Sequence, residues 1–156
     1  SLSFKIFKPI IHILKANFYL AQTYYKSKSY KVAIPFYEYV IEQGQNDFSE
    51  ESLSRLSQIY LFEEDYVNAI PLLDRLEQEA YSSENVMFAQ SNLMQGYYKT
   101  DAFELAIDYA KKILQKDKLD ISIANDAKVI IARAAIENED FRTAEEFYTE
   151  VKKCSW

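Results

Sequence analysis

The residue types that most often perform catalysis or bind metals are scarce in this sequence. His12 is the only histidine and Cys154 the only cysteine. The chain therefore lacks the partners for a Ser-His-Asp arrangement, an HExxH motif or a multi-histidine metal site. His12 is typical of a helix-surface or packing histidine, and Cys154, with no histidine near it in sequence, is typical of a bystander thiol.

Phosphate-binding loops and paired catalytic carboxylates are not indicated either. The only glycines are Gly44 and Gly96, so neither GxGxxG nor GxxxxGK[ST] can be formed. The adjacent glutamate pairs are Glu63-Glu64 and Glu145-Glu146. They fall in expected turns or on an outward helix face, where carboxylates are usually solvated. We expect no enzymatic activity, no cofactor and no metal site within this chain.

The composition predicts that the elements carrying any function are helices. Of 156 residues, 49% are apolar or aromatic, 2 are Gly and 3 are Pro. Glycine and proline together make up about 3% of the chain, against an average of about 12%. That is too few turn formers for a sandwich, a barrel or a Rossmann sheet, so the sequence predicts an all-α protein. The length fits one domain with its own core.

Charge is distributed unevenly along the chain. The net charge is −6, and the pI near 4.9 argues against nucleic-acid binding. The first 36 residues contain six lysines and no acid, so residues 37–156 carry a net −12. The basic end is interpreted either as six solvated lysines or as a segment that lies near an anionic membrane or an acidic neighbour.

The sequence predicts no transmembrane segment and leaves the compartment open. The longest apolar run, residues 6–14, is interrupted by Lys8, Pro9 and His12 and falls short of the roughly 20 residues that span a bilayer. Residues 1–16 do not have the order of charge, apolar stretch and cleavage site that a secretory signal has. Both a cytoplasmic and a periplasmic location are compatible with the chain, with any signal lying outside it.

Four internal repeats organise the chain. Each copy places an aromatic residue three positions before an alanine. The pairs are Tyr30 and Ala33, Tyr66 and Ala69, Phe103 and Ala106, and Phe141 and Ala144. Successive alanines are 36, 37 and 38 residues apart. Because a period of 20 to 50 residues indicates a repeat architecture, this spacing decides the expected fold.

Each copy is predicted to form a hairpin of two helices. In the first copy, apolar residues recur at helical spacing over residues 18–25 and again over 30–41, with a polar turn at 26–29. Polar residues in the four turns are suited to cap the second helix of each hairpin. Between the first two copies, Asp47 and Glu50 have the spacing of a capping box, which predicts a helix start at Asp47.

The repeats resemble the tetratricopeptide repeat family. The match is carried by Leu20-Ala21, Tyr24, Ala33 and Tyr37, and by equivalent positions in the later copies. The resemblance implies a right-handed superhelix of four hairpins and about eight helices, with the first helix of each hairpin on the inner face. Residues 1–13 extend the first helix, and residues 14–156 form one domain with repeats at about 14–46, 50–81, 87–119 and 124–153. The chain lacks the family's Trp and closing Pro, and its period exceeds the usual 34 residues.

The resemblance also indicates which side chains face the inner groove. Equivalent positions of the first helices form a ladder of amides, tyrosines and lysines, in which the first and third copies share Gln-x-Tyr-Tyr-Lys. The predicted contacts are Gln22, Tyr25, Lys26, Gln58, Leu61, Phe62, Gln95, Tyr98, Lys99 and Arg133. Such a surface suits a peptide, since amides pair with backbone, tyrosines supply contact area and lysines meet carboxylates. The alternative is a solvated face left by shared repeat ancestry.

The expected function is therefore a non-catalytic scaffold that binds a protein or peptide. The carboxylate clamp of co-chaperone family members is not reproduced, because Phe18, Gln22, Arg55, Phe88 and Asn92 occupy the matching places. A second hypothesis is a structural segment of a longer array, similar to large bacterial repeat proteins of the cell envelope, with end-to-end self-association. A third is the regulatory domain of a larger protein.

Overall fold

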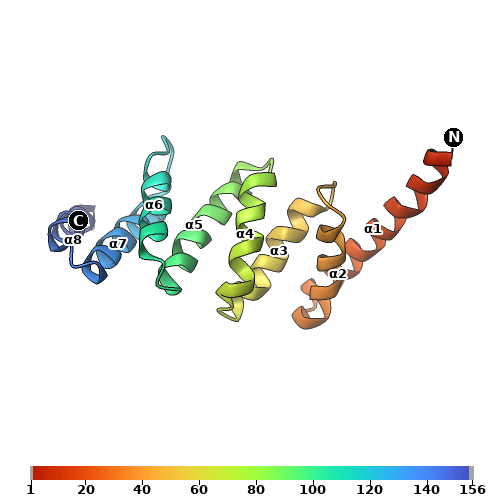
Figure 1. The fold of residues 1–156 in the computed structure, drawn as a ribbon, viewed down its shortest axis with the longest axis horizontal. Coiled ribbons are helices and arrows are strands. Elements are labelled where there is room, and N and C mark those ends of the chain that lie inside the picture. Colours follow the sequence, from red (N-terminus) through yellow and green to blue (C-terminus); the bar gives the residue numbers. More distant parts are fainter. Residues whose placement is uncertain (1, 155–156) are drawn as a thin grey trace. The chain divides into compact units, whose positions relative to one another are not determined.

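The computed structural model describes residues 2–154, with side chains described for residues 9–151. That part of the chain contains eight helices and no strand (Figure 1), as the composition predicts. The helices are α1 (Leu2–Lys26), α2 (Tyr30–Glu42), α3 (Ser49–Phe62), α4 (Tyr66–Glu79), α5 (Ser83–Lys99), α6 (Phe103–Leu114), α7 (Ile121–Glu137) and α8 (Phe141–Cys154).

The helices pack as four sequential hairpins in two compact units. Unit 1 comprises residues 1–81 and unit 2 comprises residues 82–156. In unit 1, α1 packs on α2 and α3 on α4, and α2 joins the hairpins by packing on α3. In unit 2, α5 packs on α6 and α7 on α8, and both α5 and α6 contact α7. The expected division of the chain into helix pairs is thus present in each unit.

All four hairpin turns have the same backbone conformation. One residue in each has a left-handed φ: Lys28 at 61°, Glu64 at 54°, Asp101 at 61° and Glu139 at 58°. The N–H of the next residue reaches back to a carbonyl of the first helix, as Ser29 does to Tyr24 at 2.8 Å and Asp65 to Tyr60 at 2.9 Å. This is a Schellman motif, which satisfies carbonyls at the helix end. These residues are also 36, 37 and 38 positions apart, so the backbone repeats with the period of the sequence.

The caps after these turns only partly match the prediction. Asp65 accepts a hydrogen bond from the N–H of Asn68 at 3.2 Å, and Asp140 accepts one from Thr143 at 3.2 Å. The Thr143 donors lower the pKa of Asp140 because they stabilise its carboxylate. Ser29, by contrast, makes no side-chain cap bond to α2.

The capping box predicted at Asp47 and Glu50 is wrong. Helix α3 begins at Ser49, with Phe48 at the N-cap. The side chain of Asn46 closes this turn by accepting a hydrogen bond from the N–H of Phe48 at 2.9 Å. Glu50 accepts a hydrogen bond from the N–H of Tyr81 at 3.1 Å. Its carboxylate therefore makes a tertiary contact and not the local capping bond that the sequence pattern predicts.

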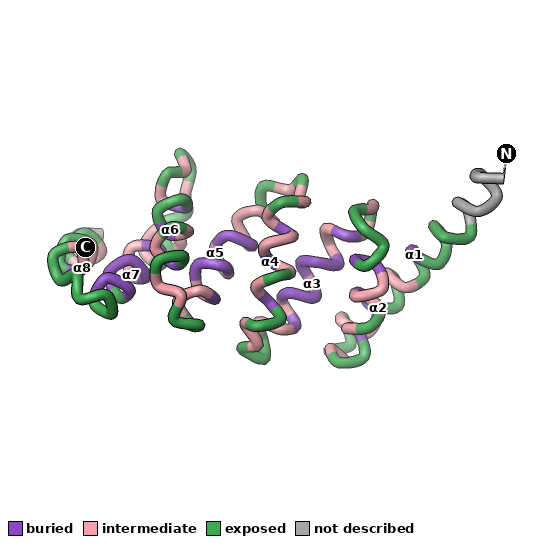
Figure 2. The backbone as a smooth tube through the Cα atoms, viewed as in Figure 1, coloured by how far each residue is buried: buried purple, intermediate pink, exposed green. Residues whose placement is uncertain are grey.

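Figure 2 marks buried positions along the helices of both units. The repeat alanines are among the buried residues: Ala33, Ala69 and Ala106 are fully buried and Ala144 is 4% exposed, as expected for positions where two helices approach closely. The fully buried residues of unit 1 also include Tyr37, Val40, Leu53, Leu73 and Leu76. The core of unit 2 is built from Met94, Ala106, Ala110, Ile113, Ala127, Ile130 and Ile131.

Candidate functional site

Three of the predicted contact residues meet on unit 1, where α1 lies beside α3. The Tyr25 hydroxyl donates to Gln58 Oε1 at 2.6 Å, and Gln22 Nε2 donates to Glu51 Oε1 at 3.4 Å. Gln22 and Tyr25 come from the last turns of α1, while Gln58 comes from the C-terminal half of α3. We call Gln22, Tyr25, Glu51, Arg55 and Gln58 the α1–α3 polar cluster.

Arg55 connects the members of this cluster. Its Nε donates to Glu51 Oε1 at 2.7 Å, its Nη1 donates to Gln58 Oε1 at 3.3 Å, and its guanidinium carbon lies 5.0 Å from the centre of the Tyr25 ring. Desolvation opposes the charge of Arg55, but hydrogen bonds with Glu51 and Tyr25 outweigh it and raise the pKa. The guanidinium is therefore a fixed positive charge with 36% of its side chain exposed.

Arg55 and Glu51 were not among the predicted contacts. They are four residues apart on α3, a spacing that brings an acid and a base together on one helix face. This spacing is visible in the sequence and could have predicted the ion pair. Alignment of the repeats does not reveal it, because the pair belongs to the second repeat alone.

An aromatic layer lies beneath and beside the cluster. Tyr37 is fully buried, and its ring centre lies 6.4 Å from that of Tyr25. The Tyr37 hydroxyl makes no hydrogen bond to the described residues, and burial raises its pKa well above the usual value. On the other side, Tyr30 contacts Tyr25 at 5.2 Å and Phe62 at 5.5 Å between ring centres. Phe62 is 60% exposed, so the aromatic row runs from the core to the surface.

The remaining predicted residues are less tightly organised. In unit 1, Lys26 is exposed and Leu61 is half-buried. In unit 2, Tyr98 packs against Phe103 at 5.7 Å between ring centres. Among the other predicted residues of unit 2, Gln95 is half-buried, and Lys99 and Arg133 are exposed. The continuation of the ladder from Gln58 to Gln95 would run from one unit to the other and stays a prediction.

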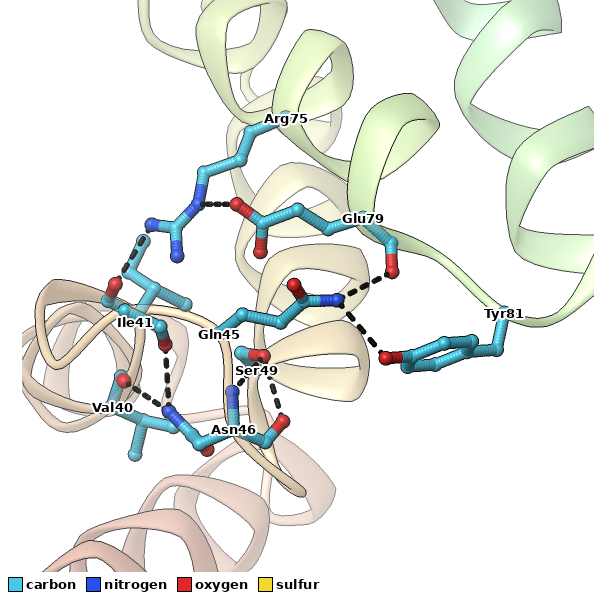
Figure 3. A network of polar contacts seen from close by, with 9 residues as sticks. Val40, Ile41, Gln45, Asn46, Ser49, Arg75, Glu79 and Tyr81 are labelled. Atoms are coloured by element: carbon cyan, nitrogen blue, oxygen red, sulfur yellow. Dashed lines mark hydrogen bonds and ion pairs between the residues drawn. The ribbon is translucent and has the colours of Figure 1, made fainter.

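A second polar region joins the two hairpins of unit 1 (Figure 3). Arg75 on α4 donates from Nη1 to the Ile41 carbonyl at 2.7 Å and from Nε to Glu79 at 2.6 Å. Gln45 Nε2 donates to the Glu79 carbonyl at 3.2 Å, and Asn46 Nδ2 donates to the Val40 carbonyl at 3.1 Å. These side chains satisfy the carbonyls at the ends of α2 and α4.

A surface pocket of about 420 Å³ opens beside this network. Its lining consists of Gln45, Asn46, Asp47, Ser49, Glu50, Glu79 and Tyr81. Most of these side chains already bond to the backbone or to each other across the loop, as Figure 3 shows for Gln45 and Tyr81. The region therefore fixes the geometry between the hairpins, and the α1–α3 polar cluster remains the better candidate for binding.

The described residues give no sign of a metal site or a membrane span. Among them, no three His, Cys, Asp or Glu side chains are grouped so that they could hold a metal ion. None of the helices in the described part is both long and apolar enough to cross a bilayer. No protein-family model matches the sequence, and no curated protein matches it.

Proposed function

We propose that this chain is a non-catalytic protein-interaction scaffold of the tetratricopeptide type. In this proposal the four hairpins continue into a right-handed superhelix, and its inner face binds a peptide or protein segment. The proposal is supported by the buried alanines at a period of 36 to 38 residues and by the Schellman turns that recur with the same period. Both features follow from a helical hairpin repeated four times.

The observation that carries the binding role is the contact between Tyr25 and Gln58. This hydrogen bond joins α1 to α3 at 2.6 Å and holds both side chains in one arrangement before any partner arrives. A surface fixed in this way loses less conformational entropy on binding. The exposed ring of Phe62 supplies apolar contact area, and the Gln22 amide can pair with the backbone of an extended segment.

The test is affinity capture from an extract of the source cells, followed by mass spectrometry. The Gln58→Glu/Leu61→Asp variant places two negative charges on the proposed face, so we expect it to lose a partner that the wild type retains. The Gln78→Glu/Val67→Asp variant adds the same charges to exposed positions of α4, where Val67 is 79% exposed, and is expected to retain the partner.

A captured protein must then be purified and titrated against the wild type and Phe62→Ser. Because Phe62 is largely exposed, this substitution changes the face and leaves the core intact. We expect Phe62→Ser to weaken binding about tenfold, which corresponds to about 1.4 kcal/mol of lost apolar contact. If wild type and the Gln58→Glu/Leu61→Asp variant retain identical proteins, the inner-face proposal is wrong.

A further inference from the structure

The N-terminal half of α1 extends well past the helix on which it packs. α1 has 25 residues and α2 has 13. At about 1.5 Å per residue, the difference leaves about 18 Å of α1 without cover from α2. Figure 1 shows α1 continuing past the end of α2. The first buried residue of α1 in the described part is Leu14, and each of residues 9–13 is exposed (Figure 2).

The exposed side chains of this segment are strongly apolar. Ile10 is 45% exposed, Ile11 50% and Ile13 47%. Together with the exposed His12 and Lys15, these three residues form what we call the α1 overhang patch. Three neighbouring isoleucines on a solvent-facing helix are costly in water, because each loses the free energy that burial would provide.

The sequence of the N-terminal half of α1 provides little intrinsic helix stability. Pro9 lies inside α1 and cannot donate a backbone hydrogen bond. Isoleucine is a weaker helix former than leucine or alanine, because its branched Cβ restricts its rotamers. An isolated stretch of about 12 residues is marginally helical in water even for good helix formers. An apolar partner for the patch would supply the missing stabilisation.

The charge of the region restricts what that partner can be. Residues 1–36 contain six lysines and no acid, and Lys5, Lys8, His12 and Lys15 recur at intervals of three, four and three in the sequence. A partner must therefore be apolar and anionic at once. An anionic bilayer surface has both properties, since acyl chains accept isoleucine while headgroups attract lysine.

A second copy of this chain fits less well. Another α1 would bring the same lysines, and the exposed acidic face of α8 offers Glu145, Glu146 and Glu150 beside Arg142 and Thr149 rather than apolar area. The acids of the chain begin only at Glu38, on α2. The uncovered part of α1 is longer than the electrostatic screening length, which is about 8 Å at physiological salt. The carboxylates from Glu38 onward would therefore repel an anionic surface only weakly when this part of α1 contacts it.

We propose that the N-terminal half of α1 is an amphipathic anchor that lies in the plane of an anionic membrane surface. Ile10, Ile11 and Ile13 enter the boundary between headgroups and acyl chains, and Lys15 contacts the headgroups. The anchor binds the surface without spanning it. This role is separate from peptide binding at the α1–α3 polar cluster, so either proposal can fail without the other.

The test is co-sedimentation of the full chain with lipid vesicles. Vesicles of phosphatidylcholine alone are compared with vesicles that also contain phosphatidylglycerol, at about 50 mM and about 500 mM salt. We expect binding to the anionic vesicles at low salt and weaker binding at high salt. Ile10→Ser/Ile13→Ser should reduce binding about tenfold or more. Lys15→Gln should reduce binding about fivefold, and only to anionic vesicles.

The matched control is Val67→Ser, which removes an exposed apolar side chain from α4 and should bind as the wild type does. Failure of the wild type to bind, equal binding by Ile10→Ser/Ile13→Ser, or equal binding to neutral vesicles would each overturn the proposal. Analytical ultracentrifugation of the same proteins tests whether a second copy of the chain binds the α1 overhang patch instead. A dimer that Ile10→Ser/Ile13→Ser dissociates, without vesicle binding by the wild type, would assign the patch to a second copy and overturn the membrane role.

Discussion

In unit 1 the junction of the first hairpin with α3 adds a polar cluster to buried aliphatic and aromatic side chains, whereas the core that joins α5 and α6 to α7 in unit 2 is built mainly from aliphatic residues and alanines. The unit 1 junction contains the α1–α3 polar cluster, and α3 also buries Ser49, Ser52, Ser54 and Ser57. The unit 2 junction is formed by Met94, Ile113, Ile130 and Ile131 with small alanines between them. The same hairpin repeat thus supports two chemically different junctions.

This difference separates stability from recognition. Aliphatic side chains gain free energy simply by leaving water, at about 25 cal/mol per Å². Polar side chains gain little net free energy and require partners in defined positions. Buried polar atoms without a hydrogen-bond partner among the described residues occur in both units, at Tyr37 and Ser52 in unit 1 and at Ser91 and Asn125 in unit 2, so they do not distinguish the units. Because of the α1–α3 polar cluster, we expect unit 1 to present specific groups at its junction and unit 2 to depend on apolar burial there.

The largest effect is expected from Ile131→Ala in unit 2. Ile131 is fully buried in the aliphatic junction. Truncation removes apolar contact and leaves a cavity, so the free energy of unfolding of unit 2 should fall by about 2–4 kcal/mol. Urea denaturation combined with hydrogen exchange resolved by unit measures this loss. Ile121→Ala on the same helix is the control, because Ile121 is 65% exposed and its truncation should change little. A loss below about 1 kcal/mol would contradict an aliphatic origin of unit 2 stability.

The next largest effect concerns Tyr37 at alkaline pH. A tyrosine in the unfolded chain loses its proton with its ordinary pKa of about 10. Burial raises the pKa of folded Tyr37 well above that value. The stabilisation is complete below the unfolded pKa and is lost as pH rises above it, because only the unfolded state releases the proton. The free energy of unfolding of unit 1 should fall by up to about 1.4 kcal/mol per pH unit in this range.

Tyr37→Phe should remove the larger part of that alkaline slope and leave the part due to Tyr60, whose pKa is also raised by burial and by nearby Glu38. Near neutral pH the variant should be as stable as the wild type or more stable, because the lost hydroxyl has no hydrogen-bond partner in the described part of the chain. Urea midpoints at about pH 7, 10 and 11 provide the comparison. Tyr19→Phe changes a tyrosine that is 54% exposed and should keep the slope. An unchanged slope in Tyr37→Phe would show that the buried hydroxyl is not its source.

The sequence predicts the backbone better than it predicts the side-chain contacts. Apolar spacing and the alanine period predict the four helix pairs, because burial of one helix face dictates both. The left-handed turn residues could not be predicted from glycine, the usual signal, since Lys28, Glu64, Asp101 and Glu139 occupy those positions. Their recurrence with the repeat period indicates that packing of the hairpin imposes the turn conformation.

The residues of the candidate site could be predicted only where the repeats align. Gln22 and Gln58 occupy equivalent positions in the first two repeats, and Tyr25 is equivalent to Leu61 and Tyr98, so alignment of the repeats finds all three cluster residues. Arg55 and Glu51 have no equivalents and become visible only as an ion pair on α3. The failed capping box shows the limit of local patterns. Glu50 has the spacing of a cap, but a backbone N–H more than thirty residues away takes its carboxylate.

A smaller effect is expected from Arg55→Met, which tests the polar junction directly. Methionine keeps the apolar stem but removes the ion pair with Glu51 and the contact with the Tyr25 ring. Because the guanidinium is partly exposed and screened, the free energy of unfolding of unit 1 should fall by only about 0.5–1 kcal/mol. High salt should narrow the difference from the wild type. Arg133→Met, at an exposed position of α7, is the control and should be near neutral.

Partner binding by Arg55→Met should fall more than stability does. The substitution disorganises Tyr25 and Gln58, which present the proposed contact groups. The measurement is the affinity for the captured partner beside the urea midpoint of the same protein. A stability loss above about 2 kcal/mol would contradict the comparison, because the polar junction would then contribute as much as an aliphatic one.

Effects no larger than that of Arg55→Met, and of the opposite sign, are expected at the turns, where the two units do not differ. Glu64→Gly in unit 1 and Asp101→Gly in unit 2 relieve the Cβ crowding of a left-handed residue, at φ 54° and 61°. Each should raise the free energy of unfolding of its unit by about 0.5–1 kcal/mol, after the larger entropy of unfolded glycine is subtracted. Glu63→Gly is the matched control, because Glu63 has a φ of −93° and glycine there should destabilise. Equal gains in both units would show that the turn is a property of the repeat alone. Unequal gains would mean that the side chains at the junction change the strain of the left-handed turn residue. The two units would then differ in backbone strain as well as in side chains.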